Sequence, residues 1–348
     1  MTIASILTGL AARGDPWLTS PAIRADEPHV TGFYEATTGS IQYLVADPIS
    51  QKCAVIDPVL DFDLRSGSTR TTSADQLLSH IETHELTLEW VLDTHPHADH
   101  FSAVGYLRDM TGAVTGIGDR VTEMQRHWKQ IYNSPDTVPT DGSQRDHLFA
   151  DGERFTVGEM EARVLLSPGH TLCSVTYVIG NAAFVHDTVF MPDLGTARAD
   201  FPGGDARQLW SSIQRILQLP SETRLFTGHD YRPDGRMACW ESTIADQKAN
   251  NLHLRNNDEA GFIKFREERD RGLPMPTLIL PALQVNLAGG RLPASGADGR
   301  RYLPLSEDPA QRFSAIIMGV LARAERTELL PMSPARDPHC TEQRMSRF

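Results

Sequence analysis

Short apolar runs alternate along the chain with segments that have a helical repeat, beginning at about residue 32. The apolar runs are rich in β-branched and aromatic residues and are bounded by turn residues, which is typical of β-strands. Gly180-Asn181, between two such runs, favours a hairpin turn. Strands are therefore predicted at 33–36, 40–46, 52–57, 88–92, 113–117, 155–157, 160–166, 174–179, 182–185 and 224–227.

Other segments repeat apolar residues every three or four positions, as the buried face of an α-helix does. Gly112 is expected to end one of these helices, and Asp205 lies near the start of another. Residues 277–288 are apolar, but Pro281 interrupts them. Helices are predicted at 74–85, 101–110, 122–132 and 205–218, and 240–270 is predicted to be mostly helical.

The same pattern divides the chain into three parts. Residues 1–30 are predicted to be an N-terminal arm, and residues 31–290 the catalytic domain. Residues 291–348 are predicted to be a C-terminal extension, with a Gly/Pro/Ala-rich linker, a helix candidate at 309–326 and a disordered end. The order of strands and helices in the middle part predicts an α/β fold, in which packed sheets carry helices on their outer faces.

Three imidazoles and one carboxylate lie within the segment Thr94–His100, whose sequence is THPHADH. The segment follows the apolar run 88–92, so it occupies a strand-to-helix loop at the carboxyl edge of a sheet, where α/β folds bind ligands. His95 and His97 can converge on one ion, while Asp99 and the last histidine are predicted to continue into the first helical turn. Imidazole nitrogen and carboxylate oxygen are ligands that zinc, iron and manganese accept, so the segment predicts a metal site.

Three further loops each bring a residue of the same kind. His170 follows the strand pair at 155–166, Asp187 follows the hairpin, and His229 follows the strand at 224–227. Any one of these residues alone would more often be a cap or a core hydrogen-bonding group. A sheet sandwich brings all four loops to one rim, so their joint arrangement predicts that the side chains converge.

Charge and composition narrow the partners of this 348-residue chain. Its formal net charge of −12 argues against nucleic acid or an anionic membrane surface as a partner, because such binders present basic patches. No apolar run reaches the roughly 20 residues of a membrane helix. The four scattered cysteines fit free thiols, so a cytoplasmic location is expected. A small-molecule substrate is therefore favoured, and a homodimer is compatible with the sequence.

At the level of motifs, the set H-x-H-x-D-H, G-H-T, an Asp after a strand and G-H-D-Y resembles the metallo-β-lactamase fold. That fold is an αββα sandwich of two mixed β-sheets with helices on the outside. The resemblance covers about residues 30–290. The stretch around Arg198 to Gly204 is similar to the persulfide dioxygenases, or sulfur dioxygenases, a branch that includes the β-lactamase-like hydrolase proteins of bacterial sulfide-detoxification operons.

This resemblance implies one Fe(II) per chain, held by His95, His170 and Asp187. Two imidazoles and one carboxylate form the facial triad of non-haem iron oxygenases, which leaves positions open. The implied reaction oxidises a glutathione-type persulfide with O₂ to sulfite and a thiol. The groups around the iron would then orient and tune its ligands. These surrounding groups are His97, Asp99, His100 and His229.

Two other functions stay open. In hydrolytic members of the fold the same seven residues hold two metal ions, so a dinuclear zinc hydrolase of a thioester or lactone, similar to glyoxalase II, is the main alternative. A non-catalytic metal-dependent sensor or scaffold is the third. The complete ligand set argues against it, since a scaffold needs no open coordination position.

Two residues are implied to bind substrate. Arg198 resembles the family arginine that pairs with a substrate carboxylate, because a guanidinium binds a carboxylate through two parallel hydrogen bonds. The alternative is a surface salt bridge to Asp200 or Asp205. Tyr231 could reach the bound substrate or O₂, and its alternative is a half-buried core tyrosine.

His186 departs from the family pattern, which usually has glycine before the aspartate. Glycine there permits a close backbone approach or unusual torsions. Strand alternation predicts that the His186 side chain points away from Asp187. A histidine that is packed in the core, or that supports the ligands without binding the metal, is therefore favoured over an additional ligand.

Overall fold

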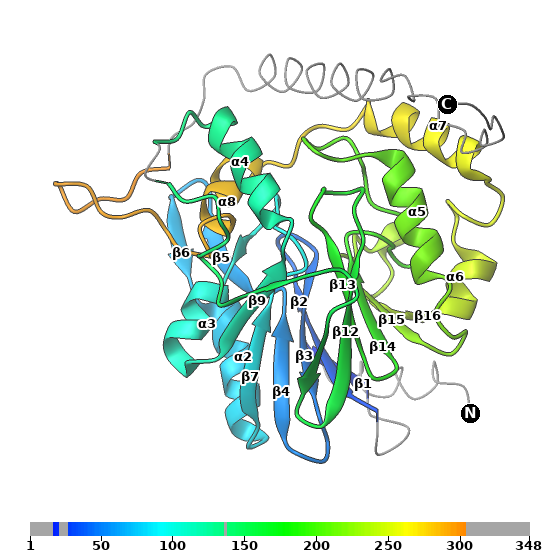
Figure 1. Cartoon of the computed structure of the whole chain (residues 1–348), viewed down its shortest axis with the longest axis horizontal. Helices are drawn as coiled ribbons and strands as arrows, with labels where there is room; N and C mark the ends of the chain where they lie inside the picture. The colour runs from blue at the N-terminus through cyan, green and yellow to red at the C-terminus, as the bar shows by residue number, and fades with distance from the viewer. Residues whose placement is uncertain (1–16, 21–26, 136–137, 304–348) are drawn as a thin grey trace, which may run out of the picture. The chain divides into compact units, whose positions relative to one another are not determined.

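The computed structural model describes residues 17–20, 27–135 and 138–303. Two β-sheets pack face to face and helices cover both outer faces (Figure 1). The helix candidate at 309–326 and the end of the C-terminal extension lie outside the described residues. No helix in the described part of the chain is long and apolar enough to cross a membrane.

The first sheet has seven strands in the order β1-β2-β3-β4-β7-β9-β10. The pairs from β1 to β4 are antiparallel, and those from β4 to β10 are parallel, so the sheet is mixed. β1 pairs with β2 from within the segment that the sequence assigned to the N-terminal arm. The strands are β1 (Trp17–Ser20), β2 (His29–Glu35), β3 (Ser40–Ala46), β4 (Lys52–Ile56), β7 (Thr87–Leu92), β9 (Val114–Gly118) and β10 (His147–Phe149).

The second sheet has six strands in the order β11-β12-β13-β14-β15-β16, with only β14 and β15 parallel. The predicted hairpin at Gly180-Asn181 is confirmed, since it joins the antiparallel pair β13 and β14. Its strands are β11 (Arg154–Val157), β12 (Met160–Leu166), β13 (Val175–Ile179), β14 (Ala182–His186), β15 (Arg224–Thr227) and β16 (Glu241–Thr243). A smaller sheet, which the sequence analysis missed, consists of β6 (Ser68–Arg70), β5 (Val59–Asp63) and β8 (Phe101–Ser102).

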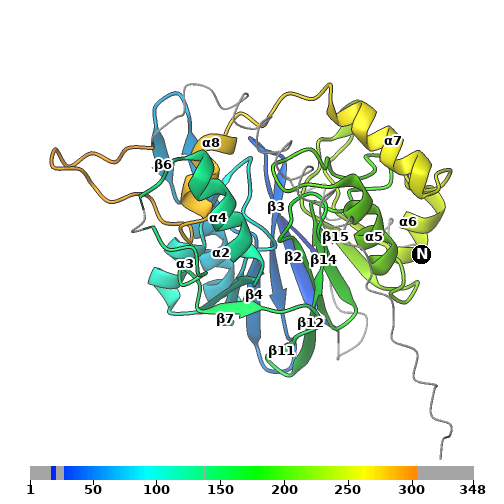
Figure 2. The same cartoon turned by 45° about the horizontal axis from the view of Figure 1, so that its top comes forward.

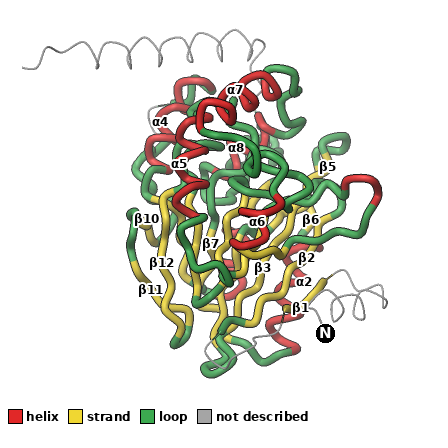
Figure 3. The backbone as a smooth tube through the Cα atoms, turned by 90° about the vertical axis from the view of Figure 1, so that its right-hand side faces the viewer, coloured by secondary structure: helices red, strands yellow, loops and turns green. Residues whose placement is uncertain are grey.

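Helices cover each sheet on the side away from the other. α2 and α3 pack on the first sheet, and α5 and α6 on the second. Figure 2, which brings the upper edge forward, places α7, α8 and the β5–β6 hairpin around that edge, and Figure 3 shows α7 and α8 beyond the ends of the strands. The helices are α2 (Thr72–Thr83), α3 (Val104–Thr111), α4 (Val121–Ile131), α5 (Ala206–Ile216), α6 (Ile244–Asn250), α7 (Glu259–Asp270) and α8 (Ile279–Asn286), with a short 3-10 turn at Pro233–Gly235.

Alternation along the strands builds the three apolar layers. Successive side chains of a strand point to opposite faces of its sheet. In β3, Ile41 and Tyr43 face the second sheet, whereas Leu44 packs toward α2 and α3. In β14, Phe184 lies between the sheets and Val185 packs against α5. The predicted αββα sandwich of two mixed sheets is therefore confirmed.

The loop that carries the histidine cluster differs from the prediction. Asp99 and His100 do not begin a helix, because α3 starts only at Val104, after strand β8. Asn286 of α8 explains the difference. Its side-chain amide donates 2.8 Å hydrogen bonds to the carbonyl oxygens of His97 and His100, and its oxygen accepts from the Ser102 amide at 2.7 Å. These backbone groups are thereby held outside a helix.

Candidate metal centre

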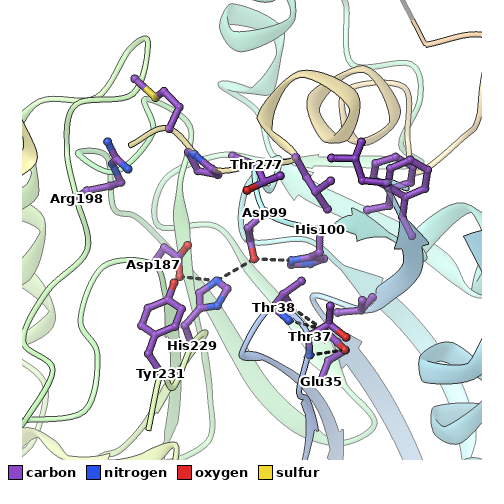
Figure 4. A pocket seen from close by; sticks show the side chains of 18 of the residues that line it. Glu35, Thr37, Thr38, Asp99, His100, Asp187, Arg198, His229, Tyr231 and Thr277 are labelled. Atoms are coloured by element: carbon purple, nitrogen blue, oxygen red, sulfur yellow. Dashed lines mark hydrogen bonds and ion pairs between the residues drawn. The ribbon is translucent and has the colours of Figure 1, made fainter. Parts of the chain in front are cut away.

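The four ligand-bearing loops meet at one edge of the sandwich. They follow β7, β12, β14 and β15, and each begins where a buried strand ends. The side chains that the sequence predicted to converge are together, and most are fully buried. Figure 4 shows Asp99, His100, Asp187 and His229 side by side at the base of a pocket.

His95, His170 and Asp187 form one candidate set of ligands for a single ion. One ligand atom from each lies within 4.8 Å of the other two. The Nε2 atoms of His95 and His170 lie 3.8 and 3.5 Å from the same oxygen, Oδ2 of Asp187. These two imidazoles and one carboxylate oxygen therefore surround a common point.

Hydrogen bonds on the far side of each ring direct these nitrogens inward. His170 Nδ1 donates to the carbonyl oxygen of Arg198 at 2.9 Å, which leaves Nε2 as the free acceptor. His95 Nδ1 lies 3.1 Å from the hydroxyl of Thr94. Burial lowers the pKa of both imidazoles, so the neutral form that binds metal is favoured.

The buried polar atoms of the site fit a metal ion. His95 Nε2, His97 Nδ1 and His100 Nε2 are buried and have no hydrogen-bond partner. Buried polar atoms are normally paired, because leaving one unpaired costs about 1–3 kcal/mol. Unpaired imidazole nitrogens beside carboxylates are the kind of donor that zinc and iron accept.

Asp99, His100 and His229 gather beside the triad. Asp99 Oδ2 accepts from His100 Nδ1 and from the Ser40 hydroxyl, both at 3.1 Å. His229 Nε2 lies 3.4 Å from both Asp99 Oδ2 and Asp187 Oδ1. Burial alone would lower the pKa of His229, but Asp187 and Asp99 raise it to about 9.

Asp57 holds the loop that carries the histidine cluster, and it was not predicted from the sequence to belong to the site. It is 1% exposed and follows β4 with a left-handed φ of 50°. It accepts hydrogen bonds from the amide and hydroxyl of Thr94 at 2.7 and 2.8 Å, and from His97 Nε2 at 2.9 Å. Its position directly after a buried strand, like that of Asp187, was the available signal.

His186 points into the centre, which corrects the prediction that its side chain turns away from Asp187. The pairing of β14 with β15 skips Val185, so the strand alternation is broken before His186. Its Nδ1 lies 3.2 Å from Asp187 Oδ1, and its Nε2 lies 3.3 Å from Asp57 Oδ2. The backbone has the kind of unusual torsion that glycine permits at this position, since φ is 36°.

Arg198 and Tyr231 both line the pocket in front of the ligands. The guanidinium of Arg198 binds both carboxylate oxygens of Asp200, at 2.6 and 2.7 Å, so the salt bridge named as its alternative is present. It also donates to the Pro274 carbonyl at 2.7 Å. Tyr231 is 58% exposed, and its ring stacks on that of His229 with centroids 5.5 Å apart.

The pocket has a volume of about 1100 Å³ and opens from the triad to the surface. The β5–β6 hairpin forms one wall and residues 273–278 form another. Arg198 lies across it from Glu35, as Figure 4 shows. The pocket is therefore of a size that admits a small molecule to Asp187 and His170.

Several known proteins are similar to this chain in sequence. A "Beta-lactamase hydrolase-like protein" of Xylella fastidiosa is 63% identical over 84% of the chain, which spans 67% of that relative. "Glyoxylase B2" of Dictyostelium discoideum is 45% identical over 78% of the chain and 93% of the relative. The human mitochondrial "Persulfide dioxygenase ETHE1" is 27% identical over 74% of the chain and 87% of its own length.

A solved structure agrees with these relatives. The crystal structure of ETHE1 from Myxococcus xanthus matches with a TM-score of 0.60 and 30% identity, over 75% of this chain and 98% of that one. Residues 40–229 match the family described as the metallo-beta-lactamase superfamily, and they contain every ligand candidate described above. The chain therefore belongs to the metallo-β-lactamase superfamily.

Proposed function

We propose that this chain is an iron-dependent persulfide dioxygenase that acts on a low-molecular-weight, glutathione-type persulfide. The observation that carries the proposal is the triad of His95, His170 and Asp187, two of which, His170 and Asp187, line an open pocket. The similarity to ETHE1 supports it. Two imidazoles and one carboxylate would hold Fe(II), which supplies the redox chemistry that lets O₂ react with sulfur.

The overall reaction balances with water as the third reactant. A persulfide RSSH, O₂ and H₂O give the thiol RSH, sulfite and two protons. The residues of the chain orient the metal ligands and bind the substrate. Thr94 and the Arg198 carbonyl fix the orientation of the ligand rings. His229 and Tyr231 face the space where the sulfur end of the substrate would lie.

A dinuclear hydrolase is the second candidate, because one observation favours it. His97, Asp99 and His100 also bring ligand atoms within 4.8 Å of one another. The similarity to Glyoxylase B2 supports this candidate. In it, Asp187 would bridge two ions, and the substrate would be a thioester or lactone.

The deciding experiment compares the two reactions on one preparation. The iron-loaded chain is expected to consume O₂ when glutathione persulfide is added and to release sulfite. The zinc-loaded chain should not. Hydrolysis of a glutathione thioester by the zinc form, with no oxygen uptake by the iron form, would replace the dioxygenase with the hydrolase.

Replacing His229 or His100 with Ala is expected to lower iron affinity or activity by roughly 10–100-fold without abolishing iron binding. Neither belongs to the triad: His229 lies 3.4 Å from Asp187, and His100 is bound to Asp99 beside it. Iron content and oxygen uptake measure the effect. Complete loss of iron in either variant would make that residue a ligand and contradict the mononuclear site.

Arg198 is proposed to bind the carboxylate of the substrate, and the structure sharpens the test. The substrate carboxylate must compete with Asp200 for the same guanidinium. Arg198→Lys is therefore expected to raise KM for glutathione persulfide about tenfold or more, since a charged hydrogen bond is worth about 1.5–3 kcal/mol. Asp200→Asn is expected to lower KM.

The iron content of both variants should stay normal, because neither side chain is a ligand. A persulfide without that carboxylate serves as the matched substrate, and its KM should change little. If Arg198→Lys impairs both substrates equally, Arg198 serves the pocket wall and the orientation of His170 instead.

A further inference from the structure

His186 occupies a position that an L-residue adopts only with strain. Its φ of 36° lies in the left-handed region, where the Cβ atom crowds the backbone and glycine is favoured. The side chain is 3% exposed and lies among the ligand candidates. Its ring centroid is 5.2 Å from that of His95 and 4.7 Å from that of His97. A strained, buried imidazole inside a metal centre calls for a function.

The ring of His186 lies between two carboxylates. Nε2 is 3.3 Å from Asp57 Oδ2, and Nδ1 is 3.2 Å from Asp187 Oδ1. Neither ring nitrogen has a hydrogen bond of good geometry, although both are buried. The imidazole is therefore placed by its neighbours within the centre and not by hydrogen bonds to the surrounding fold.

Asp187 presents its two oxygens to different groups. Oδ2 faces His95 and His170, the nitrogens of the triad. Oδ1 faces His229 Nε2 at 3.4 Å and His186 Nδ1 at 3.2 Å. A second ion held by Asp99 and His229 would lie on the Oδ1 side of Asp187, because His229 Nε2 is 3.4 Å from both Asp99 Oδ2 and Asp187 Oδ1. In this chain the imidazole of His186 already lies against that oxygen.

We propose that His186 limits the centre to one metal ion, because its ring occupies the approach to Asp187 Oδ1 that a second ion would use. The inference rests on the metal triad of the proposed function, but not on the reaction with O₂. It makes this residue a determinant of metal number, and so of the choice between single-ion and two-ion chemistry on one set of ligands.

Gly228 gives the ring the space it needs. A Cβ atom on Gly228 would lie 2.4 Å from His186 Nδ1, and the next nearest atoms also belong to that ring. The φ of Gly228 is not in the left-handed region, so Ala at this position meets the ring without backbone strain of its own. Gly228→Ala is therefore a steric probe of where the His186 ring lies.

Zinc titration of the metal-free chain, followed by gel filtration and elemental analysis, tests the proposal. The wild-type chain is expected to retain about one equivalent of zinc, and His186→Gly about two. His80 and His84 stack on α2 with centroids 4.0 Å apart and could take up surface zinc. All variants are therefore compared in a His84→Ala background. Two equivalents in the wild type, or one in His186→Gly, would overturn the proposal.

A double-mutant cycle checks the ring position without any metal. Gly228→Ala is expected to lower Tm in the wild-type chain but to have little effect in His186→Gly, where the clashing ring is absent. An equal loss in both backgrounds would place the ring elsewhere and remove the basis of the proposal. His186→Ala repeats the zinc titration in case the glycine variant folds poorly.

Oxygen uptake by the iron form of the wild type is measured on the same preparations. One retained zinc without oxygen uptake would leave the role of His186 standing and remove the dioxygenase. Oxygen uptake together with an unchanged zinc count in His186→Gly would support the dioxygenase and remove the proposed role of His186.

Discussion

Replacing His170 with Ala is expected to give a folded protein that is purified almost without iron and has no measurable oxygen uptake. His170 supplies one of only three proposed protein ligands. The loss should exceed the roughly 10–100-fold effect of removing a group that merely supports a ligand. The fold should tolerate the change, because the side chain lies at the edge of the sandwich beside the pocket. Elemental analysis and circular dichroism on the same sample measure both effects.

His147→Ala is the matched control for this variant. His147 also pairs with a carboxylate, Glu153 at 2.6 Å, but it lies on β10 away from the centre. Its removal should leave iron content and activity unchanged. Retention of about one iron by His170→Ala would show that the ion is held by another set of residues, and the triad would have to be abandoned.

Asp57→Ala is expected to lower the free energy of unfolding on the order of 3 kcal/mol and to reduce metal affinity as well. Truncation leaves the amide of Thr94 and the Nε2 of His97 buried without an acceptor. Buried groups that lose a charged partner carry the full cost of desolvation. Burial would raise the pKa of Asp57, but His186 and His97 hold it below its usual range, so a charged acceptor is what is lost.

Chemical denaturation of the metal-free chain separates the two effects, since no ion then contributes to stability. Asp151→Ala is the control, because Asp151 also accepts from a backbone amide, that of Leu166, and pairs with Arg215, but is exposed. Its removal should cost about 1 kcal/mol or less. A similar cost for the two substitutions would mean that Asp57 does not organise the histidine loop.

Much of the sandwich could be predicted because the strands are short and their apolar residues alternate or cluster. Leu44 and Tyr43 point to opposite layers, as the period of a strand requires. The helix at 205–218 was equally visible, and Asp205 caps it by accepting from the Gln208 amide at 2.8 Å. The β5–β6 hairpin was missed, because burial in β5 does not alternate along the strand and β6 has only three residues, all polar.

The ligand set could be predicted from residue chemistry, but its supports could not. His170 and Asp187 are recognisable from their type and their place after a strand. Asn286 was not, since it lies in an apolar helix and acts through backbone groups far away in the sequence. The predicted orientation of the His186 side chain was wrong for a related reason. The alternation of side chains along a strand does not reveal the irregular pairing of β14 with β15.

The bonds made by Asn286 also bear on the order in which the protein is assembled. All the ligand candidates lie before residue 230, so a chain still being synthesised has every one of them long before α8 emerges from the ribosome. Until then the hydrogen bonds from Asn286 to the carbonyls of His97 and His100 cannot form. Because contacts between residues so distant in sequence form late, the histidine loop reaches its final shape only when the end of the domain docks. A metal ion that binds before α8 docks would therefore be held by a loop that is not yet ordered. The ordered site would form only after α8 has packed against the histidine loop.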